Sequence, residues 1–345
     1  MRKSLVSVWT SLWLSGCWFA VSPAWSAQPL IPGTGQKLTQ VGDDFEDPKW
    51  SFTHNMPKSS EEQDERKRLP SGWSGNQRWY EGIKRGQPDV IERVPVPEGG
   101  LEGSKFALLL KTRQSGVPGS LSNTMQQDDF VCNVAARLGG NMLVSQQPSV
   151  VVRVYVPPFD QWEQRNGASF GFRLSLDTHA YKAPEGEKRK RWIIDPYWPG
   201  MFAELQRGRG DKQPTTAYWR IRGDQMGRDF RGPQIKEPGW WTLGMSVTPD
   251  GQVHYYIRQG IGDLTAENFV TSQFPYGYKA ERFKTFFFNV CNRDDGRTWS
   301  TPWIVDDPSV YFIPTSRTSV AQRPVTGNSP NTSSNANRRP QSRGR

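Results

Sequence analysis

Two short acidic segments lie near opposite ends of this 345-residue chain, Asp43 to Asp47 and Trp303 to Asp307. Both adjoin strand-forming residues, so pairing of the first and last strands would bring their carboxylates together. Such a cluster needs a bound cation or a surface position. Side chains alternate along a strand, so Asp306 and Asp307 cannot both point inward, and backbone carbonyls would have to complete a metal shell. Calcium is one interpretation and surface carboxylates are the other; the candidate ligands are Asp44, Glu46, Asp306 and Asp307.

A second set of chemically capable residues lies on the strand expected from Gln252 to Arg258. Its polar face carries Gln252, His254, Tyr256 and Arg258, and its other face is apolar. Residues on other strands would join it: Arg173, Arg220 or Arg222, and Glu204. The cations would neutralise a uronate carboxylate, and His254 and Tyr256 would transfer protons as the catalytic pair. An ordinary solvent face, a sugar-binding face and a lyase site are the three interpretations.

Aromatic residues and the distribution of charge favour a carbohydrate partner over a nucleic acid. The chain has 15 tryptophans, four of them in the first 26 residues, and Trp198, Trp219, Trp241 and Tyr256 are candidate platforms, although Trp219 and Trp241 equally suit a core. The formal charge is +10, but two of these cations lie at residues 2–3 and six lie after residue 314. Residues 4–314 therefore carry only +2, which disfavours nucleic acid.

The N-terminus is typical of an export signal. Met1-Arg2-Lys3 precedes an apolar run, and a small-residue site follows, so residues 1–26 are interpreted as a signal peptide. The stretch Leu14 to Cys17 resembles a lipobox, which would instead leave a lipid anchor at Cys17. No other stretch reaches the roughly 18 consecutive apolar residues that a membrane span needs. We expect a secreted or cell-envelope protein.

Cysteine and histidine are too sparse for zinc or iron chemistry. Three histidines show no ligand spacing. Cys132 and Cys291, the two cysteines beyond the signal, would either form a disulfide in an oxidising compartment or remain as buried thiols. No cofactor is required by any pattern in the sequence.

Period-two alternation dominates residues 38–314, which are interpreted as one antiparallel β-sandwich. Trp241 to Val247 and Gln252 to Arg258 predict a hairpin about Pro249-Asp250-Gly251. Residues 59–68 form a charged insertion, and residues 264–270 suggest a helical turn. Residues 315–345 lack acids and large apolar runs, which predicts a disordered basic tail. Further strands are expected at 106–111, 150–156, 169–176, 201–206, 217–222, 283–290 and 303–312.

The acidic segments, the Trp240–Ile257 hairpin and the Trp303–Tyr311 stretch resemble secreted bacterial jelly-roll domains of the concanavalin A-like lectin/glucanase superfamily. Galactose-binding-like jelly rolls are the alternative, but they usually need about half the length. The resemblance implies glycan binding or cleavage and frequent calcium between terminal strands. Glucanases of the superfamily carry a Glu-x-Asp-x-Glu strand, which this sequence lacks.

Alginate lyases of this fold offer a weaker match in motif order. Ala203 to Arg207, Gln252-Val253-His254 and Phe283 to Phe288 stand where the three lyase motifs would. The first arginine is absent and Phe288 replaces the tyrosine, so Tyr256 would have to donate the proton. The leading prediction is an exported protein that binds polysaccharide; the alternatives are a His/Tyr polysaccharide lyase and a non-catalytic envelope or matrix protein.

Overall fold

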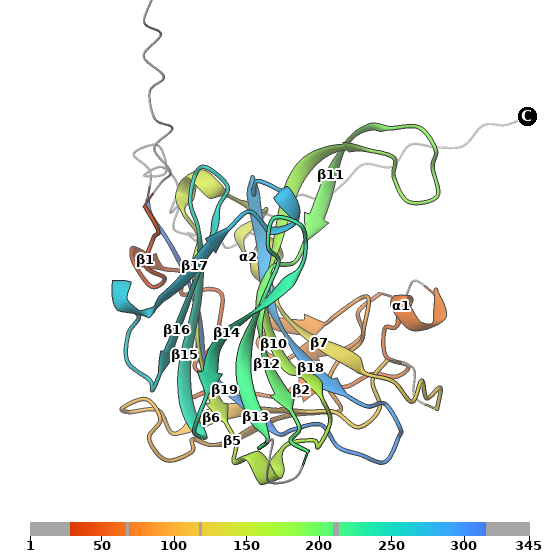
Figure 1. Ribbon diagram of the computed structural model, residues 1–345, viewed down its shortest axis with the longest axis vertical. Helices are drawn as coiled ribbons and strands as arrows, with labels where there is room; N and C mark the ends of the chain where they lie inside the picture. The colour runs from red at the N-terminus through yellow and green to blue at the C-terminus, as the bar shows by residue number, and fades with distance from the viewer. Residues whose placement is uncertain (1–27, 67–68, 117–118, 210–213, 315–345) are drawn as a thin grey trace, which may run out of the picture.

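The computed structural model describes residues 28–66, 69–116, 119–209 and 214–314, and these form two antiparallel β-sheets packed face to face (Figure 1). This is the jelly-roll sandwich predicted from the sequence. The predicted signal peptide, the lipobox and the basic tail lie outside the described residues. None of the helices in those ranges is long and apolar enough to cross a membrane.

One sheet has eight strands in the order β17-β16-β15-β9-β19-β6-β5, with β1 on β19. The strand that pairs with β19 is β1, with Gln36 opposite Phe312. The acidic segment Asp43 to Asp47, where the first strand was expected, forms no strand. Its strands are β1 (Gln36–Lys37), β5 (Val90–Pro95), β6 (Phe106–Lys111), β9 (Ser149–Val156), β15 (Gly239–Val247), β16 (Val253–Gln259), β17 (Phe269–Gln273) and β19 (Trp303–Phe312).

The other sheet has eleven strands in the order β14-β13-β12-β10-β18-β7-β4-β3-β2, with β11 on β10 and β8 on β18. Its strands are β2 (Phe52–Thr53), β3 (Trp73–Ser74), β4 (Trp79–Glu81), β7 (Gln126–Cys132), β8 (Met142–Leu143), β10 (Gly167–Lys182), β11 (Arg191–Tyr197), β12 (Gly200–Gln206), β13 (Thr216–Arg222), β14 (Asp229–Ile235) and β18 (Arg282–Asn292).

Helical structure in the described ranges is short. The charged insertion contributes α1 (Glu61–Asp64), and α2 (Val134–Leu138) follows β7. Four single 3₁₀ turns lie at Val144–Gln146, Phe159–Gln161, Ala266–Asn268 and Pro275–Gly277. The turn expected within 264–270 is therefore present, but Phe269 already begins β17.

The core forms where the inward faces of the two sheets meet. Along β10, Phe170, Phe172 and Leu174 point inward because alternate residues of a strand share one face. Trp303 of the eight-stranded sheet lies 5.0 Å from Phe170, ring to ring. Trp219 and Trp241, from opposite sheets, meet at 6.0 Å and are both buried. These two tryptophans are thus core residues and not sugar platforms.

Candidate functional site

A cleft of about 410 Å³ opens on the outer face of the eleven-stranded sheet. Its floor comes from outward-pointing residues of β4, β7, β10, β13 and β18, while α1, the turn after β4 and Trp198 form its walls. The alternation that sends Phe172 and Leu174 into the core sends Arg173 and Ser175 into this cleft. Five cations line it against three carboxylates: Lys84, Arg85, Arg173, Arg222 and Lys284 against Glu61, Glu62 and Asp129.

Arg173 is the most firmly positioned of the cations. Its side chain is only 4% exposed, and its Nε and Nη2 donate hydrogen bonds to the carbonyl oxygen of Trp198 at 3.2 and 2.8 Å. The guanidinium lies over the rings of Phe202 and Phe287, at 5.6 and 5.3 Å. Burial, and then neighbouring Arg222, lower its pKa to about 10, so the group stays charged at neutral pH.

Asp129 provides a buried carboxylate at the β7 side of the cleft. Asn289 Nδ2 donates to its Oδ1 at 2.5 Å, and Gln127 Nε2 donates to the same atom at 3.2 Å. Burial raises the pKa of Asp129, although the positive charges of Arg85 and Arg173 oppose that rise. The first four residues of β7 are polar, so this strand was not predicted from the sequence. Asp129 was therefore missed as a candidate site residue.

The wall of the cleft contains an ion pair, two lysines and an aromatic ring. Arg85 forms an ion pair with Glu62 of α1. Lys84 places its Nζ 5.1 Å from the centre of the Trp198 ring. Lys284 projects from β18 as an exposed side chain. Arg222 is also paired, with Asp229 at 3.2 Å. With these two pairs set aside, Lys84, Arg173 and Lys284 remain against Glu61 and Asp129. The cleft therefore suits an anion that also offers an apolar face.

Two of the residues predicted as sugar-binding, Arg173 and Trp198, line this cleft, as does Arg222, the alternative to Arg220. Arg220 and Glu204 lie on the neighbouring strands and pair with each other, with Arg220 Nη2 at 2.5 Å from Glu204 Oε1. The hydroxyl of Tyr218 also donates to Glu204, at 2.6 Å. Arg220 and Glu204 are therefore occupied by one another and do not line the cleft.

The prediction that His254 and Tyr256 share one site with Arg173 and Arg222 is wrong. β16 belongs to the eight-stranded sheet, so its polar face points away from the cleft, on the opposite side of the sandwich. His254 is fully buried between Thr248 Oγ1, at 2.8 Å, and Ser272 Oγ, at 2.6 Å. Burial lowers its pKa to about 4, so the imidazole is neutral at pH 7.

The other members of that strand face also have structural partners. Tyr256 packs in a small cluster with Val151 and Leu264, and its ring meets Phe269 at 5.5 Å. Arg258 Nη1 donates to the carbonyl of Asp263 at 2.7 Å. Gln252 lies in the turn before β16, where its backbone N–H donates to Asp250. The alternation itself was predicted correctly, since Val253, Tyr255 and Ile257 are in the core.

The four candidate calcium ligands separate into three environments. Glu46 and Asp306 both lie within hydrogen-bond distance of Ser104 Oγ, at 3.2 and 2.9 Å, and burial raises the pKa of Asp306 to about 6. Asp307 pairs with Lys37 and Arg153, and Asp44 is exposed at a turn. Among the residues that the structure describes, no group of three or more His, Cys, Asp or Glu is arranged to hold a metal.

Asp43, which sequence reasoning passed over, is the buried carboxylate of the first acidic segment. Its Oδ2 accepts from Trp50 Nε1, Trp79 Nε1 and Asn76 Nδ2 at 3.0, 3.2 and 2.8 Å. The following Phe45 adopts φ 57° and is completely buried. The segment therefore fastens the N-terminal chain to the core through hydrogen bonds and packing.

Cys132 and Cys291 are two free, buried thiols, so the disulfide interpretation is wrong and the thiol interpretation holds. Both lie on adjacent strands, but Cys291 stands opposite Gln127 in the β18–β7 register. Cys132 is five residues further along β7, roughly 16 Å at 3.3 Å per residue. A disulfide requires Cα atoms within about 7 Å.

Several solved structures are similar to this chain in fold. One is the carbohydrate esterase vb_24B_21 from the Shiga toxin-encoding bacteriophage phi24B, at 13% identity and a TM-score of 0.39 over 69% of this chain and 91% of that one. Another is the catalytic domain of a GH131 beta-glucanase from Podospora anserina, at 9% identity and a TM-score of 0.38 over 69% and 87%. A third is the alginate lyase PA1167 from Pseudomonas aeruginosa, at 8% identity and a TM-score of 0.33 over 66% and 84%.

No family model matches the sequence, and no curated protein matches it.

Proposed function

We propose that this chain is an exported protein that binds an acidic polysaccharide, with a sugar-acid unit held in the cleft of the eleven-stranded sheet. The observation that carries the proposal is the excess of cations around an aromatic wall, on a face that no other part of the described chain fills. A uronate presents a carboxylate for the cations and a C–H face for an aromatic ring. The signal-like first 26 residues support export.

Arg173 supplies the anchoring charge. Two of its five N–H donors are committed to the Trp198 carbonyl, which fixes the plane of the guanidinium and leaves the others to meet a carboxylate. A positioned guanidinium loses little entropy on binding, so its charge-assisted hydrogen bonds contribute fully. Lys284, on the neighbouring strand β18, adds positive charge beside it, whereas the charge of Arg222 is paired with Asp229.

Trp198 and Asp129 supply what orients a sugar ring. The Trp198 side chain is half-buried, with one face of its ring approached by Lys84. Hydrogen bonds from Asn289 and Gln127 hold the carboxyl group of Asp129 at a fixed position, where it can exchange a hydrogen bond with a sugar hydroxyl.

Calorimetric titration with uronic-acid oligosaccharides tests the proposal. We expect binding to the acidic oligosaccharide and little binding to the same oligosaccharide after its carboxyl groups are reduced to alcohols. Lys284→Gln should weaken binding roughly tenfold through loss of one charge-assisted contact. Lys236→Gln, the same charge change at an exposed position outside the cleft lining, is the matched control.

Equal affinity for the acidic and the neutral forms, or equal losses in the two lysine variants, would overturn the proposal. An absence of binding by the wild-type chain to every acidic oligosaccharide tried would do so as well.

A further inference from the structure

β10 and β11 continue past the body of the sandwich as a two-stranded arm, defined here as residues 178–195 (Figure 1). The pairing of β10 with β18 ends at Asp177, opposite Arg282. The pairing of β10 with β11 runs on, to Lys182 opposite Arg191. Within the arm, β10 has therefore lost its neighbour β18, and β11 pairs with β10 alone.

The arm exposes an aromatic surface. Trp192 is 69% exposed, Tyr181 59% and Ile194 51%, although all three are large and apolar. Tyr181 and Trp192 stand directly opposite each other in the strand register, and their rings lie 5.7 Å apart. An isolated ribbon gains nothing from exposing such residues, so a cluster of this kind indicates a contact surface.

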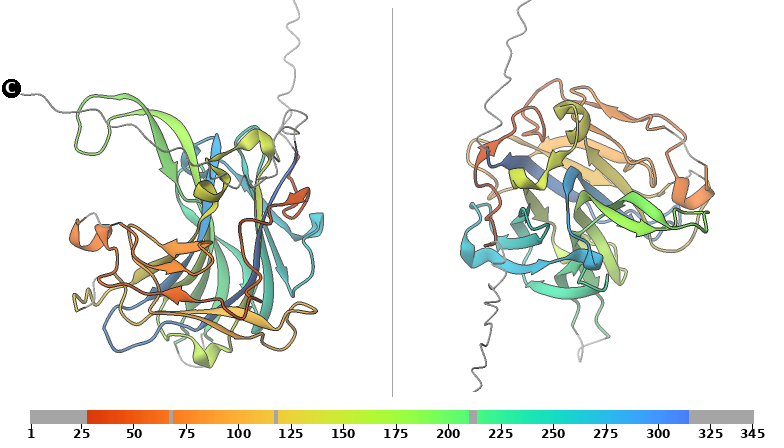
Figure 2. Two further views of the ribbon diagram at one scale, coloured as in Figure 1. Left: turned by 180° about the vertical axis from the view of Figure 1, so that it is seen from behind. Right: turned by 90° about the horizontal axis from the view of Figure 1, so that it is seen from above.

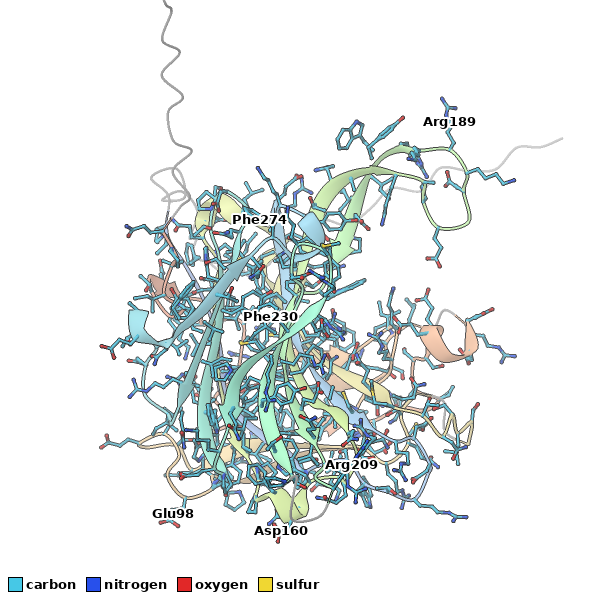
Figure 3. The ribbon with its side chains drawn as sticks, in the orientation of Figure 1. Glu98, Asp160, Arg189, Arg209, Phe230 and Phe274 are labelled. Atoms are coloured by element: carbon cyan, nitrogen blue, oxygen red, sulfur yellow. The ribbon has the colours of Figure 1, made fainter. Side chains whose placement is uncertain are left out.

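The cationic tip of the arm adds a charge preference. Residues 188–191 read Lys-Arg-Lys-Arg, directly before Trp192. Of these, Arg191 pairs with Glu187, at 2.9 Å. Figure 3 shows Arg189 at the end of the arm with its side chain directed away from the body. A ligand suited to this surface would carry repeated negative charges and apolar faces, which are the features inferred for the ligand of the cleft.

The arm and the cleft are continuous along β10. Side chains two residues apart share a face, so Tyr181 belongs to the same face of the strand as Arg173 and Ser175. From Ser175 to Tyr181 is six residues, roughly 20 Å at 3.3 Å per residue. The arm also extends on the same side of the molecule as α1, which walls the cleft, in all three orientations of Figures 1 and 2.

We infer that the arm is a second contact surface for the same acidic polysaccharide, which would run from the cleft along β10 to the Tyr181–Trp192 pair. This inference rests on the proposed function. It adds that affinity grows with chain length, because an oligosaccharide long enough to reach the arm gains a second contact without a second encounter.

Titrations with uronic-acid oligosaccharides of increasing length test the inference in the full chain. Trp192→Ala should weaken binding of long oligosaccharides roughly fivefold or more and leave binding of the shortest bound species unchanged. Lys284→Gln should weaken both. Trp299→Ala is the matched control, because Trp299 is a partly exposed tryptophan beside Lys111 and Arg113, outside the cleft and the arm.

The outcomes separate the two proposals. If wild-type protein binds neither short nor long oligosaccharides, the proposed function fails and the arm inference fails with it. If wild-type protein binds both and Trp192→Ala does not alter the dependence on length, the arm inference alone fails. Co-sedimentation with phosphatidylglycerol vesicles provides the remaining comparison. If Trp192→Ala abolishes co-sedimentation but leaves the affinity for long oligosaccharides unchanged, the arm binds lipid and the inference is overturned.

Discussion

Arg173 and His254 both occupy outward-facing positions on their strands, yet only Arg173 lines a cleft. His254 is enclosed by two hydroxyl groups and carries no charge at neutral pH. The difference arises from what covers each sheet. The N-terminal segment reaches the outer face of the eight-stranded sheet: Pro32 lies against Gly244, and Ile31 packs on the cluster of Tyr256. His254 looked like a catalytic residue in the sequence, but because it is buried its role is structural.

The buried His254 should make the protein sensitive to acid. The unfolded chain takes up a proton near the ordinary histidine pKa of 6.5, whereas the folded pKa is lowered to about 4. The unfolded state thus binds more protons over this interval, and stability falls as the pH drops from about 6.5 to 4, by as much as about 3 kcal/mol. His254→Gln removes this contribution. Between pH 7 and pH 4 the wild type should therefore lose more unfolding free energy than the variant, by roughly that amount.

Urea denaturation of both proteins at several pH values measures this difference. A stability difference that does not change with pH would show that His254 is not held neutral by the fold. Oligosaccharide affinity at pH 7 provides the second readout, and we expect it to be the same in both proteins. A marked loss of affinity in His254→Gln would place the histidine at the binding site after all.

At the scale of elements, the cleft depends on a close approach between β10 and β12. Gly200 stands opposite Arg173 in the strand register. A Cβ atom added to Gly200 would lie 2.5 Å from Arg173 Cγ and 2.7 Å from the carbonyl oxygen of Phe172. The absence of a side chain at Gly200 therefore leaves space for the stem of Arg173, and hence for its contact with the Trp198 carbonyl.

Gly200→Ala should lower both stability and affinity. Overpacking of this kind destabilises by about 1–3 kcal/mol, and displacement of Arg173 should weaken binding of an acidic oligosaccharide about tenfold. Gly232→Ala on β14 is the matched control, since its added Cβ would lie 2.8 Å from the Trp219 carbonyl oxygen, and neither residue lines the cleft. Thermal denaturation and titration of both variants distinguish the effects. If Gly232→Ala weakens binding as much as Gly200→Ala, the loss is one of general stability.

β6 and β19, which each contain a run of apolar residues, could be predicted from the sequence, and β7, which begins with four polar residues, could not. The bounds of β6 and β19 match the prediction, and the β15–β16 hairpin turns at Gly251, with φ 83°, as expected. β7 begins Gln-Gln-Asp-Asp and reads as a loop, because the partners that satisfy its buried carboxylates come from distant segments. Lys58, for example, meets Asp128 at 2.8 Å across 70 residues.

The site was only partly predictable for a related reason. Arg173 and Trp198 were identified as individual residues of a suitable type, and strand alternation gave the correct face of β16. Which sheet each strand joins depends on pairing between segments far apart in the chain, such as β10 with β18. Local patterns do not report that pairing. The prediction therefore combined His254 and Arg173 in one site, although they lie on opposite outer faces of the sandwich.

At the scale of the whole molecule, the two outer faces of the sandwich are used differently. The eight-stranded sheet carries the fastened N-terminal segment, whereas the eleven-stranded sheet carries the cleft and the arm. Residues 4–314 together have a formal charge of only +2. Attraction of a polyanion by this part of the chain would therefore come from the placement of charges and not from their sum.

This arrangement predicts a salt dependence that the cleft controls. Raising sodium chloride from 0.1 M to 1 M shortens the screening length from about 10 Å to about 3 Å and should weaken binding of a short uronic-acid oligosaccharide roughly tenfold. Lys284→Gln should reduce that dependence, and Lys236→Gln should leave it unchanged, because only Lys284 lines the cleft.

The six arginines between residues 315 and 345 offer a competing source of the same attraction. A chain that ends at Pro314 separates the two, since it keeps the cleft and loses those arginines. If the cleft governs the electrostatics, the shortened chain should show the salt dependence of the full chain. A dependence that disappears with residues 315–345 would assign the attraction to the C-terminal arginines and contradict the prediction.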